Sequence, residues 1–483
     1  MYPEKFIQRI SSQHYIDSEV LLKALKEPSP VSIRINPVKW NNTPENCEPV
    51  AWCRNGFYIR ERPSFTLDPL FHAGCYYPQE ASGMFLEQVF RQINGDRKNI
   101  RVLDLCGAPG GKSTHLSELI CNNGFLVANE VIKTRASVLA ENLTKWGLSN
   151  AIVTQSDPSA FSRLGGFFDV MLIDAPCSGE GMFNNQIAIN EWSEDNAFLC
   201  CERQKRILSD AWPSLKEEGI LIYSTCTFNP DENERNIKWL AEKHEAETVK
   251  LDVTGFEGIT VIDYKGIEGY GFYPGRTEGE GLFISVLRKK DKNRSANMGK
   301  PQGRGRKPGK NEINIIAELT YFSEDSSARI NDELISIPCS NNEYAQLSGS
   351  LKIIKSGTKV CTLKKKNYVP SHELAMSVYL RKSVFNTLNI GYADALSYLR
   401  RDNIRSANAP SGWNIASYEG VNLGFINNIG YRLNNYYPVE WRIRMSVQDT
   451  ELKSIRWGKT ATRALTCLPA GRDTKVHQEI KFD

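Results

Sequence analysis

Two cysteines stand in short polar stretches that each follow an apolar run. Cys177 lies in Asp174-Ala175-Pro176-Cys177-Ser178-Gly179, and Cys226 lies in Ser224-Thr225-Cys226-Thr227. Most cysteines are small buried side chains, but a thiolate is also a strong nucleophile. An ordinary thiol, with a pKa of about 8.5, is already ionised to a few per cent at pH 7. Modest activation would therefore let either cysteine attack an electrophilic carbon.

Four acids also stand at the ends of apolar runs that predict strands. Ligands of open α/β sheets bind outside the carboxyl ends of the strands, so acids at these ends are expected to gather at one edge. Glu130 follows the Gly110-Gly111 pair by about twenty residues, a spacing typical of acids that bind ribose hydroxyls. The four acids are Asp104, Glu130, Asp157 and Asp174.

Asp104 leads into a loop of small residues, and a helical pattern follows the loop. Small residues let a ligand approach the backbone, and the N-terminus of a helix offers unpaired N–H groups. A phosphate-binding P-loop needs four residues between its glycines, whereas three separate Gly107 from Gly111. S-adenosylmethionine carries no phosphate and needs acids for its ribose. The stretch therefore favours S-adenosylmethionine, although Val170–Asp174 could pass for the magnesium-binding strand of an NTPase.

The pattern between these residues predicts the scaffold that positions them. Apolar runs alternate with segments whose apolar residues recur at helical spacing. This alternation predicts an α/β fold with a Rossmann-like parallel sheet. Expected strands cover residues 101–104, 125–130, 151–157, 168–174, 219–227 and 281–287, and expected helices cover 112–120, 133–146, 199–215 and 231–243.

Composition narrows the class of protein. The 483 residues suffice for about three domains, and the net charge of +4 favours no particular partner. There is no run of 18 apolar residues and no apolar leader, so we expect neither a membrane span nor export. The twelve cysteines contain no C-x-x-C pair and the six histidines are scattered. We therefore expect no disulfide scaffold, no metal site and a cytoplasmic monomer.

Three motifs together resemble the Sun/Nol/Nop family of RNA cytosine-C5 methyltransferases. They are Cys106–Lys112, Asp174–Gly181 and Ser224–Thr227, and the resemblance extends over residues 1 to about 290. The Gly179-Glu180-Gly181 triplet and the long C-terminal extension are most similar to the bacterial RsmF-type branch, whose members act on 16S rRNA of the small ribosomal subunit. The resemblance implies an S-adenosylmethionine-dependent RNA methyltransferase, with tRNA as the alternative substrate.

The same resemblance implies roles for individual residues. Cys226 would add to C6 of a cytosine that has been flipped from its stack, which makes C5 reactive toward the sulfonium methyl. Cys177 would help to remove the C5 proton or to release the product, and Asp174 would hydrogen-bond the cytosine ring edge. Pro158 and Gly107 depart from the family pattern, which usually has a smaller residue and an alanine there. The implied cofactor contacts are Asp104, Cys106, Gly107, Ala108, Pro109, Gly110, Gly111, Lys112, Glu130, Asp157 and Asp174.

Cationic side chains are the candidates for RNA contact. Residues 31–37 alternate like a strand, and the polar face carries Ser32, Arg34 and Asn36; a solvated strand face is the alternative. Ser32–Asn36 and Tyr77–Ser82 resemble the leading RNA-contact region of the family. Lys205 is a contact by family pattern or a solvated helix charge. The full set of candidates is Arg34, Lys205, Arg400, Arg401, Arg442 and Arg444.

The chain is expected to divide into six segments. Residues 291–312 are rich in Lys, Arg and Gly and are expected to form a flexible basic linker, with or without phosphate contacts. Trp441–Arg444 is expected to form a strand with two cations on one face. The segments are an N-terminal RNA-contact module (1–80), the methyltransferase domain (81–290), the linker (291–312), a middle module of short strands (313–370), a β-rich PUA-like module (371–460) and a disordered tail (461–483).

Three classes of function compete at this point. An S-adenosylmethionine-dependent RNA cytosine-C5 methyltransferase is the leading hypothesis. A P-loop-like NTPase is the second, and ATP-dependent protection of the fold would favour it. A catalytically silent RNA-binding protein is the third, and the presence of both Cys177 and Cys226 argues against it.

Overall fold

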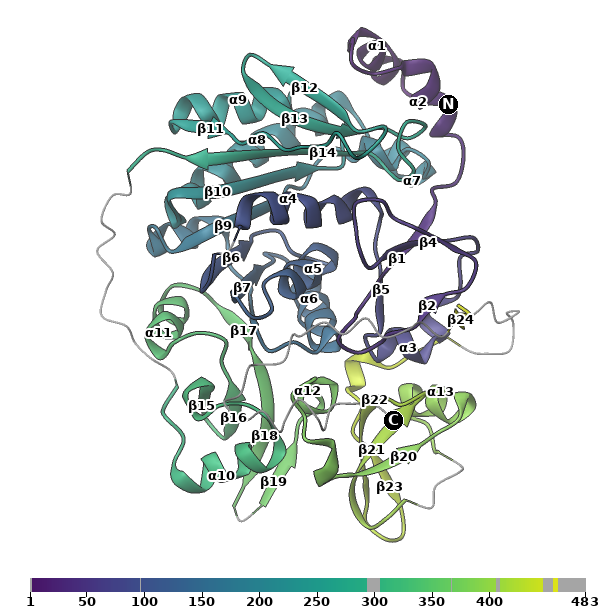
Figure 1. The fold of residues 1–483 in the computed structure, drawn as a ribbon, viewed down its shortest axis with the longest axis vertical. Coiled ribbons are helices and arrows are strands. Elements are labelled where there is room, and N and C mark those ends of the chain that lie inside the picture. The colour runs from purple at the N-terminus through teal and green to yellow at the C-terminus, as the bar shows by residue number, and fades with distance from the viewer. Residues whose placement is uncertain are drawn as a thin grey trace.

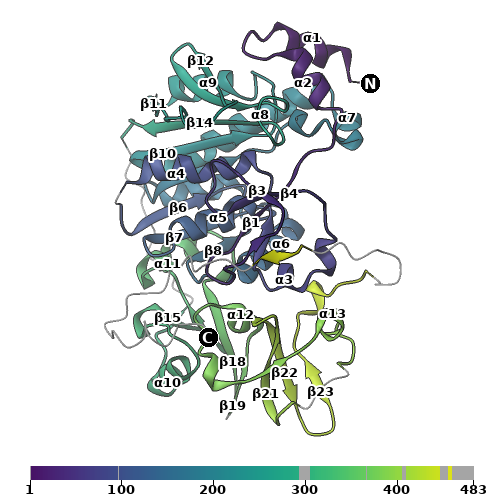
Figure 2. The same ribbon diagram turned by 45° about the vertical axis from the view of Figure 1, so that its right-hand side comes forward.

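The computed structural model describes residues 2–95, 97–292, 305–365, 367–404, 409–445 and 455–458. The core of the expected basic linker (293–304) and the expected disordered tail (461–483) lie outside these ranges. A large sheet with helices on both sides fills the upper part of the molecule in Figure 1, and the C-terminal half lies below it. Figure 2 shows the same arrangement turned about the vertical axis. No helix in the described ranges is both long and apolar enough to span a membrane.

The large sheet confirms the expected Rossmann-like α/β fold. Strands β6 to β10 pair in parallel, and the chain adds antiparallel strands at both edges. A further strand, β11 (Ala246–Thr248), pairs with β14. In spatial order the strands are β12 (Thr260–Tyr264), β13 (Ile267–Phe272), β14 (Leu282–Lys289), β10 (Leu215–Thr225), β9 (Phe168–Asp174), β6 (Ile100–Asp104), β7 (Gly124–Asn129), β8 (Ala151–Thr154) and β17 (Ile353–Ser356).

Successive residues of each strand point to opposite faces, so the sheet has two apolar cores. Val102 of β6 packs in the core beneath three helices, α4 (Leu86–Asn94), α5 (Gly111–Leu119) and α6 (Lys133–Trp146). The next residue, Leu103, packs in the core on the other face. The helices on that face are α8 (Glu194–Ala211), α9 (Glu234–Lys243) and α11 (Asn341–Ser350).

The chain turns around between β6 and β9, which are neighbours in the sheet. From β6 it proceeds to β7 and β8 on one side, and it then returns to β9 and β10 on the other. Such a switch point leaves a crevice at the carboxyl ends of the two strands, and ligands of open α/β sheets bind there. Asp104 ends β6 and Asp174 ends β9, so both acids border this crevice.

The N-terminal module combines three α-helices with a small antiparallel sheet of order β3-β4-β1-β5. The prediction that the polar face of β1 contacts RNA or solvent is wrong, because Ser32, Arg34 and Asn36 are all buried. That face packs on the methyltransferase domain. The elements are α1 (Glu4–Ser12), α2 (Ser18–Ala24), β1 (Val31–Ile35), β2 (Thr43–Pro44), β3 (Cys47–Pro49), β4 (Gly56–Ile59), α3 (Pro69–His72) and β5 (Tyr76–Pro78).

The C-terminal half contains two further sheets, of order β15-β16-β18-β19 and β20-β21-β22-β23, the second with one parallel pair. Its elements are α10 (Lys310–Leu319), β15 (Ser327–Ile330), β16 (Glu333–Ser336), β18 (Thr358–Lys364), β19 (Asn367–Pro370), α12 (His372–Met376), β20 (Asn386–Asn389), α13 (Tyr392–Arg400), β21 (Gly412–Tyr418), β22 (Val421–Asn428) and β23 (Leu433–Asn435). Helix α13 packs against α3, and Tyr392 donates a hydrogen bond to the carbonyl of Leu67 (2.9 Å). The second sheet and the N-terminal module thus share one core.

Several sequence expectations differ from this half of the structure. Residues 313–370 are not a separate module of short strands, because β17 pairs with β8 and extends the large sheet. The expected linker ends earlier than residue 312. The backbone of Arg306 forms an antiparallel β-bridge with that of Arg329, and α10 begins at Lys310. No strand covers 441–444. A short 3-10 helix (Val439–Trp441) precedes extended residues, although Arg442 and Arg444 are exposed and Ile443 is buried, as the alternation predicted.

Two helices of the methyltransferase domain also have different limits. The helix expected over 199–215 is α8, which begins at Glu194 because the hydroxyl of Ser193 caps it. The helix expected over 231–243 is α9, which begins at Glu234. Hydrogen-bonded turns between Asn229 and Asn233 occupy the residues before it.

Candidate active site

The two cysteines approach each other because their strands are neighbours. Strands β9 and β10 pair in parallel, with Asp174 opposite Ser224. The loops that follow therefore leave the same edge of the sheet side by side. The Sγ atoms of Cys177 and Cys226 are 3.1 Å apart, and the backbone N–H of Cys226 donates to Sγ of Cys177 (3.3 Å). Both side chains keep partial exposure, so a substrate can reach the pair.

The surroundings of Cys177 oppose its ionisation. Its hydrogen bond with Cys226, burial of the thiol and the negative charge of Glu232 raise the pKa of Cys177 well above its usual range. Cys177 is therefore a protonated thiol at neutral pH.

Asp174 is oriented from two sides at the start of the Cys177 loop. Its Oδ2 pairs with Nζ of Lys112 (2.8 Å), and its Oδ1 accepts a hydrogen bond from Oγ of Ser224 (2.7 Å). Partial burial opposes the charge of Lys112, but the negative charge of Asp174 raises its pKa, so this lysine stays cationic. The pair joins the small-residue loop to the cysteine loops, as expected if both serve one reaction.

Asp104 lies buried at the end of β6, beneath the small-residue loop. Its Oδ2 accepts a hydrogen bond from Oγ of Ser113 (2.6 Å), and burial raises its pKa to about 7. Its Oδ1 is buried and has no hydrogen-bond partner among the described residues. A Cβ atom at Gly107 would lie 2.6 Å from Oγ of Ser113 and 3.2 Å from Oδ2 of Asp104. The glycine therefore keeps space beside an acceptor that can still bind a donor.

The loop itself is held open from α6. Arg135 donates to the carbonyl of Ala108 (2.9 Å), and Asn142 donates to the carbonyl of Pro109 (2.8 Å). Gly110 has a φ of 124°, which only glycine adopts readily. Gly111 then begins α5, so Cys106–Lys112 connects a strand end to a helix N-terminus as the sequence predicted.

The two remaining acids lie in different environments. Glu130 is buried after β7, accepts a hydrogen bond from the backbone N–H of Ile132 (2.9 Å) and lies 3.5 Å from Arg135. Asp157 is partly exposed, and hydrogen bonds from Ser159 lower its pKa. It lies 3.6 Å from Arg206 of α8. Glu130 therefore borders the loop, whereas Asp157 caps the short helix that follows β8.

Two buried carboxylates beside the cysteine loops were not identified as site residues from the sequence. Glu180 has no exposed side-chain surface, pairs with Arg9 of α1, and accepts hydrogen bonds from Trp192 Nε1 (2.9 Å) and the N–H of Phe228 (3.2 Å). Glu232 lies between the two cysteine loops and is equally buried. The sequence placed Glu232 only within the helix expected over 231–243, and acids are rarely buried without a cation.

The predicted RNA contacts separate into buried and exposed residues. Arg34 is wrong as an RNA contact, because its side chain has no exposed surface. It donates to Gln79 (2.9 Å), Glu118 (2.6 Å) and Thr114 (2.7 Å), and thereby fastens β1 to α5. Lys205 is one-third exposed and pairs with Glu202 (2.7 Å). Four candidates lie in the C-terminal half: Arg400, Arg401, Arg442 and Arg444.

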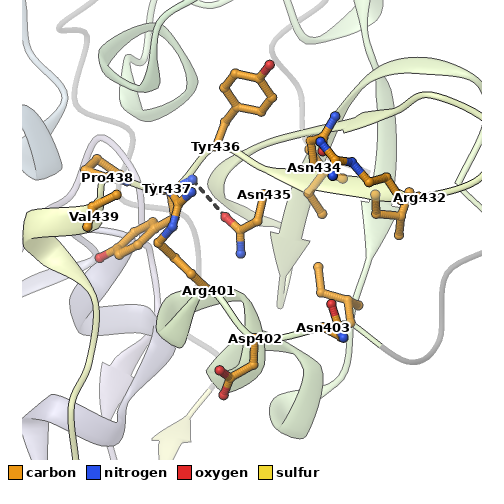
Figure 3. A pocket seen from close by; sticks show the side chains of 13 residues that line it. Arg401, Asp402, Asn403, Arg432, Asn434, Asn435, Tyr436, Tyr437, Pro438 and Val439 are labelled. Carbon is orange, nitrogen blue, oxygen red and sulfur yellow. Dashed lines mark hydrogen bonds between the residues drawn. The ribbon is translucent and has the colours of Figure 1, made fainter.

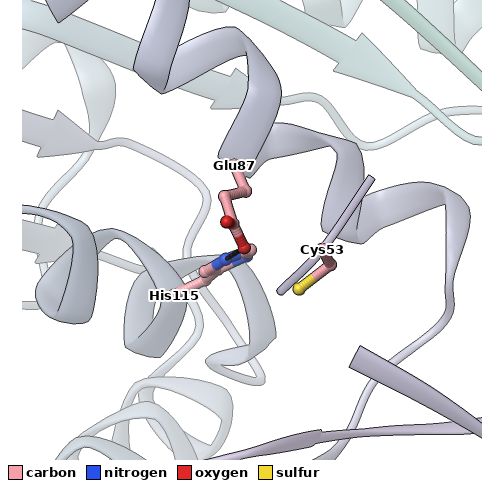
Figure 4. A group of neighbouring side chains, drawn as sticks. All are labelled: Cys53, Glu87 and His115. Atoms are coloured by element: carbon pink, nitrogen blue, oxygen red, sulfur yellow. Dashed lines mark ion pairs between the residues drawn. The ribbon is translucent and has the colours of Figure 1, made fainter. Parts of the chain in front are cut away.

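One group of possible metal ligands occurs among the described residues. Ligand atoms of Cys53, Glu87 and His115 lie within 4.8 Å of one another (Figure 4). Glu87 is already occupied, because it pairs with Arg91 (2.6 Å) and His115 (3.6 Å) and accepts from the N–H of Arg54 (3.1 Å). Burial and the charge of Arg34 lower the pKa of His115 to about 4. The group is a buried ion-pair cluster that joins the N-terminal module to α4 and α5.

Comparison with known proteins relates this geometry to a family. Family models match residues 92–288 (16S rRNA methyltransferase RsmB/F), residues 2–81 (N-terminal domain of 16S rRNA methyltransferase RsmF) and residues 385–443 (methyltransferase RsmF PUA domain). Ribosomal RNA small subunit methyltransferase F of Aliivibrio fischeri is 30% identical over 471 residues, with 91% of this chain and 97% of the relative covered. The chain belongs to the RsmB/F methyltransferase family.

Other relatives agree. Ribosomal RNA small subunit methyltransferase F of Enterobacter sp. (strain 638) is 28% identical, with 91% of this chain and 95% of the relative covered. A crystal structure of a methyltransferase homolog protein from Pyrococcus horikoshii is 29% identical with a TM-score of 0.50, and the match covers 60% of this chain and 95% of that chain. Membership of the RsmB/F family rules out the P-loop NTPase hypothesis. It also confirms the PUA-like fold expected near the C-terminus.

Proposed function

We propose that this RsmB/F-family enzyme transfers a methyl group from S-adenosylmethionine to C5 of a cytosine in 16S rRNA. The 3.1 Å contact between Cys177 and Cys226, beside Asp174, carries the proposal. Cytosine C5 is not nucleophilic by itself. An enzyme that methylates C5 must first add a nucleophile to C6. A cysteine thiolate at the carboxyl edge of the large sheet can act as this nucleophile.

Residues at the sheet edge fit the cofactor. When bound, S-adenosylmethionine supplies an electrophilic methyl group on its sulfonium. The unpartnered Oδ1 of Asp104 and the space that Gly107 leaves suit an ammonium donor of the ligand. Glu130, beside the loop, suits the ribose hydroxyls. Asp157 remains a candidate for the adenine, although its present partners are Ser159 and Arg206.

The protein groups then act on the cytosine in sequence. Sγ of Cys226 forms a bond to C6, the electrons of the C5–C6 double bond move toward N3, and N3 takes up the proton that the thiol loses, where Asp174 holds the protonated ring edge. C5 takes the methyl group while the sulfonium becomes a neutral thioether, and C5 afterwards loses its proton to solvent beside the partly exposed Cys177. The C6–S bond then breaks and restores the double bond. Cys177, which its surroundings keep protonated before the reaction, assists this last stage.

The PUA-like module offers a surface for the rest of the RNA. A surface pocket of about 820 Å³ lies between the end of α13 and the turn from β22 to β23. Arg401 and Arg432 border it from different elements, and Asn434 and Tyr436 complete the rim (Figure 3). Cations bind phosphate and an exposed tyrosine can stack on a base, so the pocket suits single-stranded RNA. Lys205, Arg442 and Arg444 are further candidates.

Bisulfite mapping tests the function directly. Cytosines of 16S rRNA are compared between the parent strain and a strain that lacks the gene, and cytosines of tRNA serve as the second substrate class. We expect one or a few 16S cytosines to lose protection in the deletion strain, because a cytoplasmic enzyme would reach assembling subunits in the parent strain. Loss of protection only in tRNA would show that tRNA, and not 16S rRNA, is the substrate. No loss in either RNA would contradict the proposal.

A further inference from the structure

A buried carboxylate outside both cysteine motifs connects their loops. Glu232 has a side chain without exposed surface and lies between β10 and α9. Its Oε1 accepts hydrogen bonds from Oγ of Ser178 (2.6 Å) and Nδ2 of Asn229 (3.2 Å). Its Oε2 accepts from the N–H of Ser178 (3.0 Å) and Nε2 of Gln204 (2.9 Å). One side chain thus holds the residue after Cys177 and the loop after Cys226 together.

This arrangement is unusual for a buried charge. The four donors match the acceptor sites of an ionised carboxylate. If Glu232 were protonated, the oxygen that carries the proton would point its hydrogen at the hydrogen of one of these donors instead of accepting a hydrogen bond. No cation is among the main influences on Glu232; burial raises its pKa, and the hydrogen bonds from Ser178 and Gln204 lower it. A buried carboxylate without a counter-ion costs free energy. Such groups are often found where function requires them.

The hydrogen bonds around Glu232 close a ring that contains both cysteines. Ser178 follows Cys177 in the chain, and its Oγ also contacts Oγ1 of Thr227 (2.8 Å). Thr227 follows Cys226. Gln204 of α8 extends the ring, since its Nε2 also donates to the carbonyl of Pro176 (3.1 Å). These hydrogen bonds link the two cysteine loops to each other and to α8, so the spacing of the thiols depends on them.

We propose that Glu232 is a positioning residue that fixes the spacing and orientation of Cys177 relative to Cys226. The inference rests on the proposed function in one respect: the spacing matters for activity only if both thiols act on the same cytosine. Glu232 has no exposed surface for a substrate or cofactor to contact, so it acts through Ser178 and Asn229. Misplacement of a reacting group by about 1 Å can lower a rate about 100-fold.

Two substitutions and one matched control separate positioning from general stability. Glu232→Ala removes all four hydrogen bonds. Glu232→Gln keeps an amide oxygen that can still accept from the N–H of Ser178 and from Gln204. Glu234→Ala is the control, because Glu234 is also buried, lies two residues away and binds Tyr15 of the N-terminal module. It makes no contact with either cysteine loop in the described residues.

Thiol spacing is measured without any RNA. Full-length protein is treated with diamide, which oxidises two thiols to a disulfide and is itself reduced to the hydrazine. Mass spectrometry then follows the peptide that joins Cys177 to Cys226. We expect the disulfide to form about tenfold more slowly in Glu232→Ala, at an intermediate rate in Glu232→Gln and at the wild-type rate in Glu234→Ala. Equal rates in all four proteins would overturn the inference, whatever the enzyme methylates.

Kinetics test the consequence for the reaction. Small ribosomal subunits from a strain lacking the gene are methylated with labelled S-adenosylmethionine. We expect kcat to fall about 100-fold in Glu232→Ala, less in Glu232→Gln and not in Glu234→Ala, with KM for the subunit nearly constant. A fall in kcat that only follows the fraction of folded protein would overturn the positioning role. Failure of the wild-type enzyme to methylate would instead contradict the proposed function, and the diamide result would stand.

Discussion

The carboxyl edge of the large sheet and the PUA-like module hold their functional side chains in opposite ways. At the sheet edge, Asp174 is held by Lys112 and Ser224, and both cysteines lie within one hydrogen-bonded network. In the PUA-like module, Arg432 and Arg444 extend into solvent. Chemistry needs groups fixed to within a fraction of an ångström, whereas phosphate contacts tolerate adjustment. The difference predicts which substitutions abolish activity and which only weaken binding.

The largest effect is expected at the cysteine pair. Cys226→Ala should abolish methylation and form no covalent complex with RNA, because no thiolate can add to C6. Cys177→Ala should still attack and methylate, then stall before release and remain joined to the RNA. A denaturing gel of each variant with substrate RNA and cofactor detects the slow band. A band that needs Cys177 and survives loss of Cys226 would reverse the two assignments.

Substitution of Arg34 tests whether this cation, expected from the sequence to bind RNA, is instead held in place by buried neighbours. Its removal leaves Glu118 buried without its partner, and breaking a buried ion pair costs about 3–5 kcal/mol. We expect Arg34→Ala to lower the free energy of unfolding by that amount in urea titrations. Arg444→Ala, at an exposed position, is the control and should change it by less than about 0.5 kcal/mol. Equal stability of both variants would show that Arg34 behaves like a solvent-exposed residue and does not stabilise the fold.

The buried cluster around His115 predicts a pH dependence of stability. The pKa of His115 is about 4 in the folded protein, below the value of about 6.5 expected when unfolded. The unfolded chain therefore binds more protons in this range, and stability falls as the pH drops from about 6.5 toward 4, by about 3 kcal/mol. His72, which is buried, and His372, which is partly buried, also have lowered pKa values and act in the same direction. Unfolding curves of His115→Gln should depend less on pH than the wild type; identical slopes would exclude His115 as a contributor.

Glu130 tests the cofactor end of the sheet edge. A hydrogen bond to a charged group contributes about 1.5–3 kcal/mol, so Glu130→Ala should weaken S-adenosylmethionine binding about 10- to 100-fold while the fold stays intact. Calorimetry measures the affinity. Glu242→Ala, at an exposed position at the end of α9, serves as the control and should bind normally. Undiminished affinity of the Glu130 variant would remove this residue from the site.

The smallest effect is expected in the PUA-like module. Arg432→Ala should weaken RNA binding only a few-fold, and the double variant with Arg442→Ala should weaken it further. Each lost phosphate contact should reduce the slope of log affinity against log salt by about 0.7 to 0.9. Lys250→Ala, at an exposed position near the far edge of the large sheet, is the control. An unchanged slope would show that these arginines do not contact phosphate.

Sequence reasoning succeeded where local pattern and local structure coincide. The strand, small-residue loop and helix around Asp104, and the two cysteine motifs, lie where they were expected, because the end of a strand determines where the next residues lie. It failed for Arg34 and Glu232. Alternation predicts which face of a strand a residue occupies, but not whether another domain covers that face. Burial of Glu232 depends on Ser178 and Gln204, which come from distant segments, so no local signal could reveal it.

Strand β17 has a consequence for how the protein is made. It pairs with β8, yet the ribosome synthesises it long after the rest of the large sheet. Until residues 353–356 emerge, β8 presents an unpaired edge, and such edges pair readily with other chains. A chain that stops after the methyltransferase domain would keep this edge open and would tend to aggregate. Completion of the C-terminal half therefore also closes the exposed edge of the catalytic sheet.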